Sequence, residues 1–170
     1  MFSRPKLKNI LFKFILIILI GSLIGILNNS FSPSGIALVG SWSKRIISDS
    51  IVVPGSYDTK DPPAISLSEA ERSFQTKKVL FVDARLKEDF NSGHIAKAIN
   101  LPYEEFKDNF SKVEKSLSSA SELIIYCDGT ECESSLFLAR ILKDKGFQNI
   151  KIFFGGWKEW VQAGLPIEKG

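Results

Sequence analysis

The sequence predicts a three-layer α/β domain with a central, mostly parallel sheet, preceded by one N-terminal transmembrane helix. Three observations predict this fold. Residues 79–84 (VLFVDA) and 122–127 (ELIIYC) are continuous apolar runs, which are typical of strands that helices cover on both faces. Helical patterns alternate with these runs, as parallel strands require. A separate, uncharged run near the N-terminus has the composition of a membrane segment.

The other elements of the domain follow in chain order. Ser68-Glu69-Ala70-Glu71 is a capping box that predicts a helix from Ser68 to about Gln75. Apolar residues at helical spacing, closed by Gly146, predict a helix over 134–145. By the same criteria we expect one or two helices over 103–119, further helices at 86–91 and 157–163, and strands at 98–101 and 150–154. The domain therefore extends over residues 64–170.

The N-terminal segment is apolar from Ile10 to Leu27, apart from Lys13. Phe14–Leu27 carries no charge, and counting back past Lys13, whose ammonium can reach the headgroups, gives a helix of about 27 Å. That length just crosses a bilayer core. We therefore expect a basic cytoplasmic tail over 1–9, a transmembrane helix or signal anchor over 10–28 in contact with the lipid bilayer, and a linker without regular elements over 29–63, where prolines and glycines interrupt every apolar stretch.

The distribution of charge predicts the orientation of the chain and excludes one class of partner. The whole chain has 22 Lys+Arg and 19 Asp+Glu, but the first 28 residues hold four bases and no acid. By the positive-inside rule, the N-terminus of this single-pass protein is cytoplasmic and the C-terminal domain is periplasmic or extracellular. The remaining residues are nearly neutral, which argues against nucleic-acid binding. A cleaved signal peptide and a fully buried core helix are the alternatives for the apolar segment.

Cys127 is the candidate nucleophile. It ends the second apolar strand, and ligand sites in open α/β sheets lie at the carboxyl ends of strands. The backbone amides of the next residues and the N-terminal end of the helix at 134–145 both favour a thiolate at this position. A small, buried, unreactive cysteine is the alternative interpretation. The position alone leaves both open.

Five motifs follow one another in a fixed order over residues 64–170: VDAR at 82–85, GHI at 93–95, Cys127, GGWKEW at 155–160 and GLP at 164–166. Together they resemble a rhodanese-like (sulfurtransferase) domain. The resemblance implies that Cys127 takes a sulfane sulfur from a small sulfur donor, holds it as a persulfide and passes it to an acceptor such as a protein thiol, without a cofactor. It also implies that Asp83, Arg85 and His94 support the fold.

The predicted active-site loop departs from the usual pattern of that family. Its members are Asp128, Gly129, Thr130, Glu131, Cys132, Glu133 and Ser134. It contains three acids and no base, whereas rhodaneses that use thiosulfate commonly have a cation there, often an arginine at the position of Cys132. A carboxylate about 6 Å from a thiolate costs roughly 2 to 3 kcal/mol at an effective dielectric of about 20. We therefore expect this sulfurtransferase to have weak thiosulfate activity.

Cys132 brings a second sulfur into the loop. We hypothesise that it resolves a persulfide or mixed disulfide on Cys127 and leaves a Cys127–Cys132 disulfide, which an oxidising compartment would preserve. The alternative is a cysteine that only packs under the loop. Two Cys and one His cannot form a four-ligand zinc site, so no metal is expected. Glu133 stands where dual-specificity phosphatases have arginine, which disfavours that activity, and a non-catalytic docking module remains the alternative function.

Overall fold

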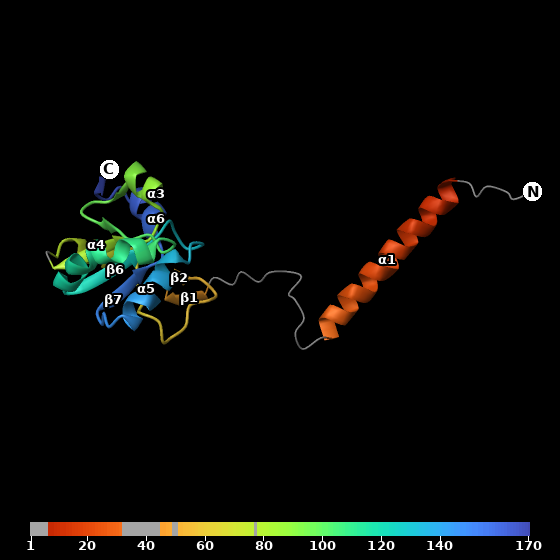
Figure 1. Cartoon of the computed structure of the whole chain (residues 1–170), viewed down its shortest axis with the longest axis horizontal. Coiled ribbons are helices and arrows are strands. Elements are labelled where there is room, and N and C mark those ends of the chain that lie inside the picture. Colours follow the sequence, from red (N-terminus) through yellow and green to blue (C-terminus); the bar gives the residue numbers. More distant parts are fainter. Residues whose placement is uncertain (1–6, 32–44, 49–50, 77) are drawn as a thin grey trace, which may run out of the picture. The chain divides into compact units, whose positions relative to one another are not determined.

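The computed structural model describes residues 7–31, 45–48, 51–76 and 78–170, and the chain divides into two compact units, residues 1–41 and 42–170 (Figure 1). The first unit contains one helix, α1 (Leu7–Phe31). Its side chains between residues 11 and 25 are exposed, and most of them are large and apolar. Over residues 11–25 the helix therefore shows no separate polar face.

No helix within the described ranges is both long and apolar enough to cross a membrane. The expected transmembrane helix over residues 10–28 is therefore not supported. Its uncharged part, Phe14–Leu27, has 14 residues. A helix of that length spans about 21 Å, which is less than a hydrocarbon core of about 30 Å.

The second unit is built on a four-stranded parallel sheet with the strand order β5-β3-β6-β7 (Figure 1). The strands are β3 (Val79–Asp83), β5 (Ile99–Asn100), β6 (Glu122–Tyr126) and β7 (Ile150–Phe153). In the central pair, Val79 lies opposite Glu122 and Asp83 lies opposite Tyr126, so the carboxyl ends of β3 and β6 meet at one edge. The predicted α/β domain with a parallel sheet is confirmed.

Helices cover both faces of this sheet. They are α2 (Leu67–Phe74), α3 (Lys87–Ser92), α4 (Phe106–Ser119), α5 (Ser134–Asp144) and α6 (Gly156–Gln162). Leu117 of α4 and Leu138 of α5 pack in one core with Val82, whereas Trp160 of α6 packs in a second core with Phe81. Neighbouring residues of β3 thus enter opposite cores, which is why the strand is apolar at successive positions.

The start of α2 differs from the prediction. Ser66, and not Ser68, is the N-cap residue, and its hydroxyl accepts a hydrogen bond from the Glu69 amide at 3.3 Å. Both serines precede a glutamate by three positions, so local chemistry favours both starts equally. Ala64, however, pairs with Ile152 in a parallel bridge. The chain leaves the sheet directly after this bridge, and the helix therefore begins two residues earlier.

Two small antiparallel sheets are additions to the predicted elements. One joins β1 (Arg45–Ser48) to β2 (Ile51–Val53), and the other joins β4 (His94–Ile95) to β8 (Ile167–Glu168). β1 and β2 lie in the segment predicted to be a linker. Val53 is 1% exposed in the core that α4 and α5 cover, and Arg140 of α5 donates to the Asp61 carboxylate at 2.7 Å. These contacts hold the segment on the domain, so the folded unit begins before residue 64.

Candidate active site

The predicted active-site loop lies at the carboxyl end of β6. Cys127 is the first residue after this strand, and Ser134 is the first residue of α5. The Cys132 amide donates to the Gly129 carbonyl at 2.9 Å, which closes a turn inside the loop. The two sulfurs therefore lie in one short, curled segment at the edge of the sheet where the sequence places them.

Cys127 is part of the domain core. Its side chain is 0% exposed and packs with residues of α4 and α5. The thiol donates towards the Cys132 carbonyl oxygen at 3.1 Å and the Ser135 hydroxyl at 3.3 Å. Burial raises the pKa of Cys127 well above the ordinary value of a thiol, and the neighbouring Cys132 raises it further. Burial therefore disfavours the Cys127 thiolate, and the amide and hydroxyl of Ser135 act in the opposite direction.

Cys132 is half-buried, and it is the sulfur that the loop stabilises as an anion. The neighbouring Cys127 thiol, which acts most strongly, and the backbone amides of Asp128 and Ser134 lower the pKa of Cys132 to about 6. The groups around Cys132 therefore favour its anionic form.

The start of α6 packs against the backbone of the loop. The Trp157 amide donates to the Cys127 carbonyl at 2.8 Å, and the Lys158 amide donates to the Asp128 carbonyl at 3.0 Å. Gly156 has φ = 58°, and a Cβ added to it would lie 2.3 Å from the Cys127 carbonyl oxygen. Glycine is the residue that allows both this conformation and this close approach. The GGW motif therefore serves the packing of two backbone segments at the site.

Lys158 is a site residue that sequence reasoning did not identify. Its ammonium forms an ion pair with the Asp128 carboxylate, and both residues line a cavity of about 260 Å³. The other residues of this lining are Gly129, Thr130, Glu131 and Cys132. The loop has no base of its own, but α6 supplies one. The adjoining GGW motif is the sequence signal that could have placed Lys158 beside the loop.

The last two residues of the predicted loop do not line this cavity. The Glu133 carboxylate accepts a hydrogen bond from the Ser56 hydroxyl. The Ser134 hydroxyl donates to the Glu104 carboxylate at 3.3 Å. Of the three loop acids, Asp128 and Glu131 are therefore the ones at the cavity.

The three residues expected to support the fold are buried near the loop. Arg85 donates to the Asp83 carboxylate from Nε at 3.0 Å and from Nη2 at 2.6 Å, and its guanidinium lies 4.9 Å from the centre of the Trp157 ring. The His94 Nδ1–H donates to the Phe90 carbonyl at 2.8 Å, and the two rings stack at 3.7 Å. None of the three lines the cavity at Cys132. Their contacts join β3, α3, β4 and α6.

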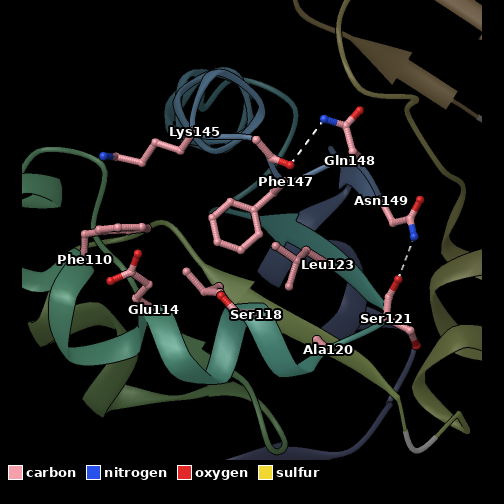
Figure 2. A pocket seen from close by; sticks show the side chains of 12 residues that line it. Phe110, Glu114, Ser118, Ala120, Ser121, Leu123, Lys145, Phe147, Gln148 and Asn149 are labelled. Carbon is pink, nitrogen blue, oxygen red and sulfur yellow. Dashed lines mark hydrogen bonds between the residues drawn. The ribbon is translucent and has the colours of Figure 1, made fainter.

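A second cavity, of about 480 Å³, lies between α4 and the end of α5 (Figure 2). Phe110, Leu123 and Phe147 form its apolar part, and the Lys145 ammonium lies 4.6 Å from the centre of the Phe110 ring. Leu123 is near the amino end of β6, so this cavity lies at the other edge of the sheet from the active-site loop. Its lining includes neither cysteine. Within the described part of the chain, no group of three or more His, Cys, Asp and Glu side chains is placed to hold a metal ion.

Comparison with known proteins points to one family. The family model of the rhodanese-like domain matches residues 66–163. An HTH-type transcriptional regulator of Mycobacterium tuberculosis is 31% identical over 134 residues, which cover 79% of this chain and 57% of the regulator. The match thus spans little more than half the length of that relative.

Solved structures share the fold. The BH2092 protein from Bacillus halodurans matches with a TM-score of 0.55 at 22% identity, and the match covers 64% of this chain and 77% of that one. A thiosulfate sulfurtransferase from Pseudomonas aeruginosa matches with a TM-score of 0.51 at 18% identity and covers 64% of this chain and 20% of that one. At these identities the likeness shows a common architecture and no more.

Proposed function

The chain belongs to the rhodanese-like domain family, and on that premise we propose that it transfers sulfane sulfur at the Cys127–Cys132 dithiol and that the two cysteines close into a disulfide as the sulfur is released. One observation carries the proposal. Both cysteines lie in one loop, the Cys127 thiol donates to the Cys132 carbonyl oxygen at 3.1 Å, and each thiol shifts the pKa of the other. Amides that curl around a sulfur favour its anionic form, and a second thiol in contact supplies an internal nucleophile.

The proposed reaction has two steps. In the first, one cysteine thiolate attacks the outer sulfur of a small persulfide, R–S–SH; the S–S bond of the donor breaks, and R–S⁻ leaves and is protonated. In the second, the other cysteine attacks the inner sulfur of this persulfide, which is the cysteine Sγ; the intramolecular disulfide forms, the bond to the outer sulfur breaks and HS⁻ leaves. The sulfane sulfur is reduced to sulfide, and the two thiols are oxidised. A dithiol reductant then restores the pair for the next turnover.

The test adds cysteine persulfide to the reduced full chain from which other thiols have been removed. We expect one equivalent of sulfide per protein and the loss of both free thiols, because the second cysteine completes the reaction internally. Mass spectrometry should find an intermediate with one added sulfur atom, followed by a protein that lacks two hydrogens. Cys127→Ser and Cys132→Ser are the controls, since neither variant can form the disulfide.

One outcome would contradict this function, and a second measurement tests which sulfur donor the site prefers. A docking module releases no sulfide and keeps both thiols free. With thiosulfate as the donor, the rate of the first step is expected to be at least about tenfold lower than with the persulfide. A repulsion of about 1.4 kcal/mol between the thiosulfate dianion and the loop carboxylates is enough for that factor. Asp128 and Glu131 supply the repulsion, and Lys158 is already paired with Asp128. Equal rates with the two donors would show that the loop carboxylates do not select the donor.

We also propose that α1 holds the chain at a membrane surface. The exposed apolar side chains between Leu11 and Leu27 and the bases that precede them support this location. After cell lysis without detergent, the full chain is expected in the membrane fraction. Recovery of the intact chain in the soluble fraction would rule out this location.

A further inference from the structure

We propose that Cys132 is the sulfur that attacks the donor and that Cys127 is the sulfur that resolves the adduct. This order rests on the proposed function, because it assigns the first and the second nucleophile of that reaction. It reverses the order expected from the sequence, in which Cys127 acts first. The access to each sulfur and the charges around it carry the inference.

The two sulfurs differ in how accessible they are to a donor molecule. Cys127 is 0% exposed, and its thiol is occupied by the Cys132 carbonyl oxygen and the Ser135 hydroxyl. Cys132 is half-buried and lines the cavity of about 260 Å³, whose lining does not include Cys127. A donor that enters this cavity therefore meets Cys132 first. A cavity of this volume suits a low-molecular-weight persulfide or disulfide.

Charge favours the same order. The amides of Asp128 and Ser134 donate to the Cys132 sulfur, and the Lys158 ammonium at the same cavity interacts with its charge. Burial of Cys127 outweighs the Ser135 amide and hydroxyl that favour its thiolate, and its S–H group faces the Cys132 carbonyl oxygen, so this S–H bond has to break before Cys127 can attack. Cys132 is thus the nucleophile that is ready when the donor arrives.

The proposed order also explains where the proton of the Cys127 thiol goes. The Cys132 thiolate attacks the outer sulfur of R–S–SH, and R–S⁻ leaves into the cavity, where water protonates it. The Cys132 persulfide, as the anion Cys132–S–S⁻, takes the proton of Cys127. The resulting Cys127 thiolate attacks Sγ of Cys132, the disulfide forms and HS⁻ leaves. The two electrons lost by the cysteines reduce the sulfane sulfur, so no further oxidant is needed.

The test uses 2,2′-dipyridyl disulfide, an uncharged probe that releases coloured pyridine-2-thione each time a thiol attacks it or its adduct. With the full chain at neutral pH, we expect one fast equivalent, then a second equivalent as the disulfide closes. Cys127→Ser should release only the fast equivalent and keep the adduct on Cys132, where peptide mapping finds it. Cys132→Ser should react at least about tenfold more slowly, because its remaining thiol is buried and protonated.

The outcomes separate this proposal from the proposed function. A fast adduct on Cys127 in the Cys132→Ser variant overturns the order but leaves sulfur transfer by the dithiol intact. A wild-type chain that releases no sulfide from cysteine persulfide contradicts the proposed function itself. Circular dichroism checks that Cys127→Ser and Cys132→Ser are folded. Alanine variants at the same two positions repeat the comparison with a different side chain.

Lys158→Gln tests the charge at the cavity. It is expected to slow the first equivalent about threefold, as loss of an exposed charge pair implies, without slowing closure of the disulfide. Lys151→Gln is the matched control, because Lys151 also forms ion pairs, with Glu69 and Glu122, but at the amino end of β6. Equal rates for the two lysine variants would contradict the contribution of Lys158 to the attacking sulfur.

Discussion

Replacing Gly156 by alanine is expected to lower the free energy of unfolding by about 2 to 5 kcal/mol, through left-handed backbone strain and overpacking. Gly156 has φ = 58°. A Cβ on it would lie 2.3 Å from the Cys127 carbonyl oxygen and 3.0 Å from the Gly129 nitrogen. Both are backbone atoms of the active-site loop, so no side-chain rotation can relieve the clash. The loop or α6 has to move, and the release of sulfide is expected to fall as well.

Gly164→Ala is the matched control for this substitution. Gly164 has φ = 67°, but no atom of the described residues lies within 4 Å of an added Cβ. Only the left-handed conformation is penalised there, at about 1 to 2 kcal/mol. Urea unfolding of the full chain, followed by tryptophan fluorescence, measures both variants. Equal losses would show that the contact between α6 and the loop does not require glycine.

Arg85→Met is expected to lower the free energy of unfolding by about 3 to 5 kcal/mol, because it leaves a buried carboxylate without its partner. The Asp83 side chain is 0% exposed, and that of Arg85 is 6% exposed. Nη2 of Arg85 also donates to the Gly93 carbonyl at 2.7 Å. Replacing this one side chain therefore removes the hydrogen-bond donors to the Asp83 carboxylate and to the Gly93 carbonyl. Both acceptors lie where α3, β4 and α6 meet.

Arg140→Met is the control for this prediction. Arg140 also pairs with a carboxylate, that of Asp61, but its side chain is 36% exposed. The Asp61 side chain is 8% exposed, but its carboxylate keeps the hydrogen bond from the Asp58 amide at 2.7 Å when Arg140 is replaced, so the expected loss is smaller, at about 1 kcal/mol. Urea unfolding of the full chain again provides the measurement. A loss for Arg85→Met as small as that for Arg140→Met would mean that water enters the site and solvates Asp83.

Strong local signals allowed the main elements of the domain to be predicted. The runs at 79–84 and 122–127 form β3 and β6, and the helix predicted over 134–145 is α5. A strand buried on both faces needs apolar residues at successive positions, and a half-buried helix needs them at helical spacing. Such patterns are contained within a few neighbouring residues, so the sequence alone reveals them.

Elements that depend on distant partners were not predictable in the same way. β4 and β8 have two residues each and exist because His94 and Ile95 pair with Glu168 and Ile167. A two-residue strand has no periodicity to detect. The choice between two equivalent capping serines at the start of α2 likewise depends on a bridge to β7. In both cases the deciding contact comes from a remote part of the chain.

By itself, the sequence determined the family, the α/β architecture and the presence of two cysteines in one loop, because ordered motifs and local periodicity specify them. Only the tertiary structure decided how these cysteines differ. Packing of α4 and α5 buries Cys127, whereas Cys132 lines a cavity to which α6 contributes Lys158. Burial and ion pairing arise between segments that are far apart in the chain. The charge balance of the loop therefore could not be read from its own residues.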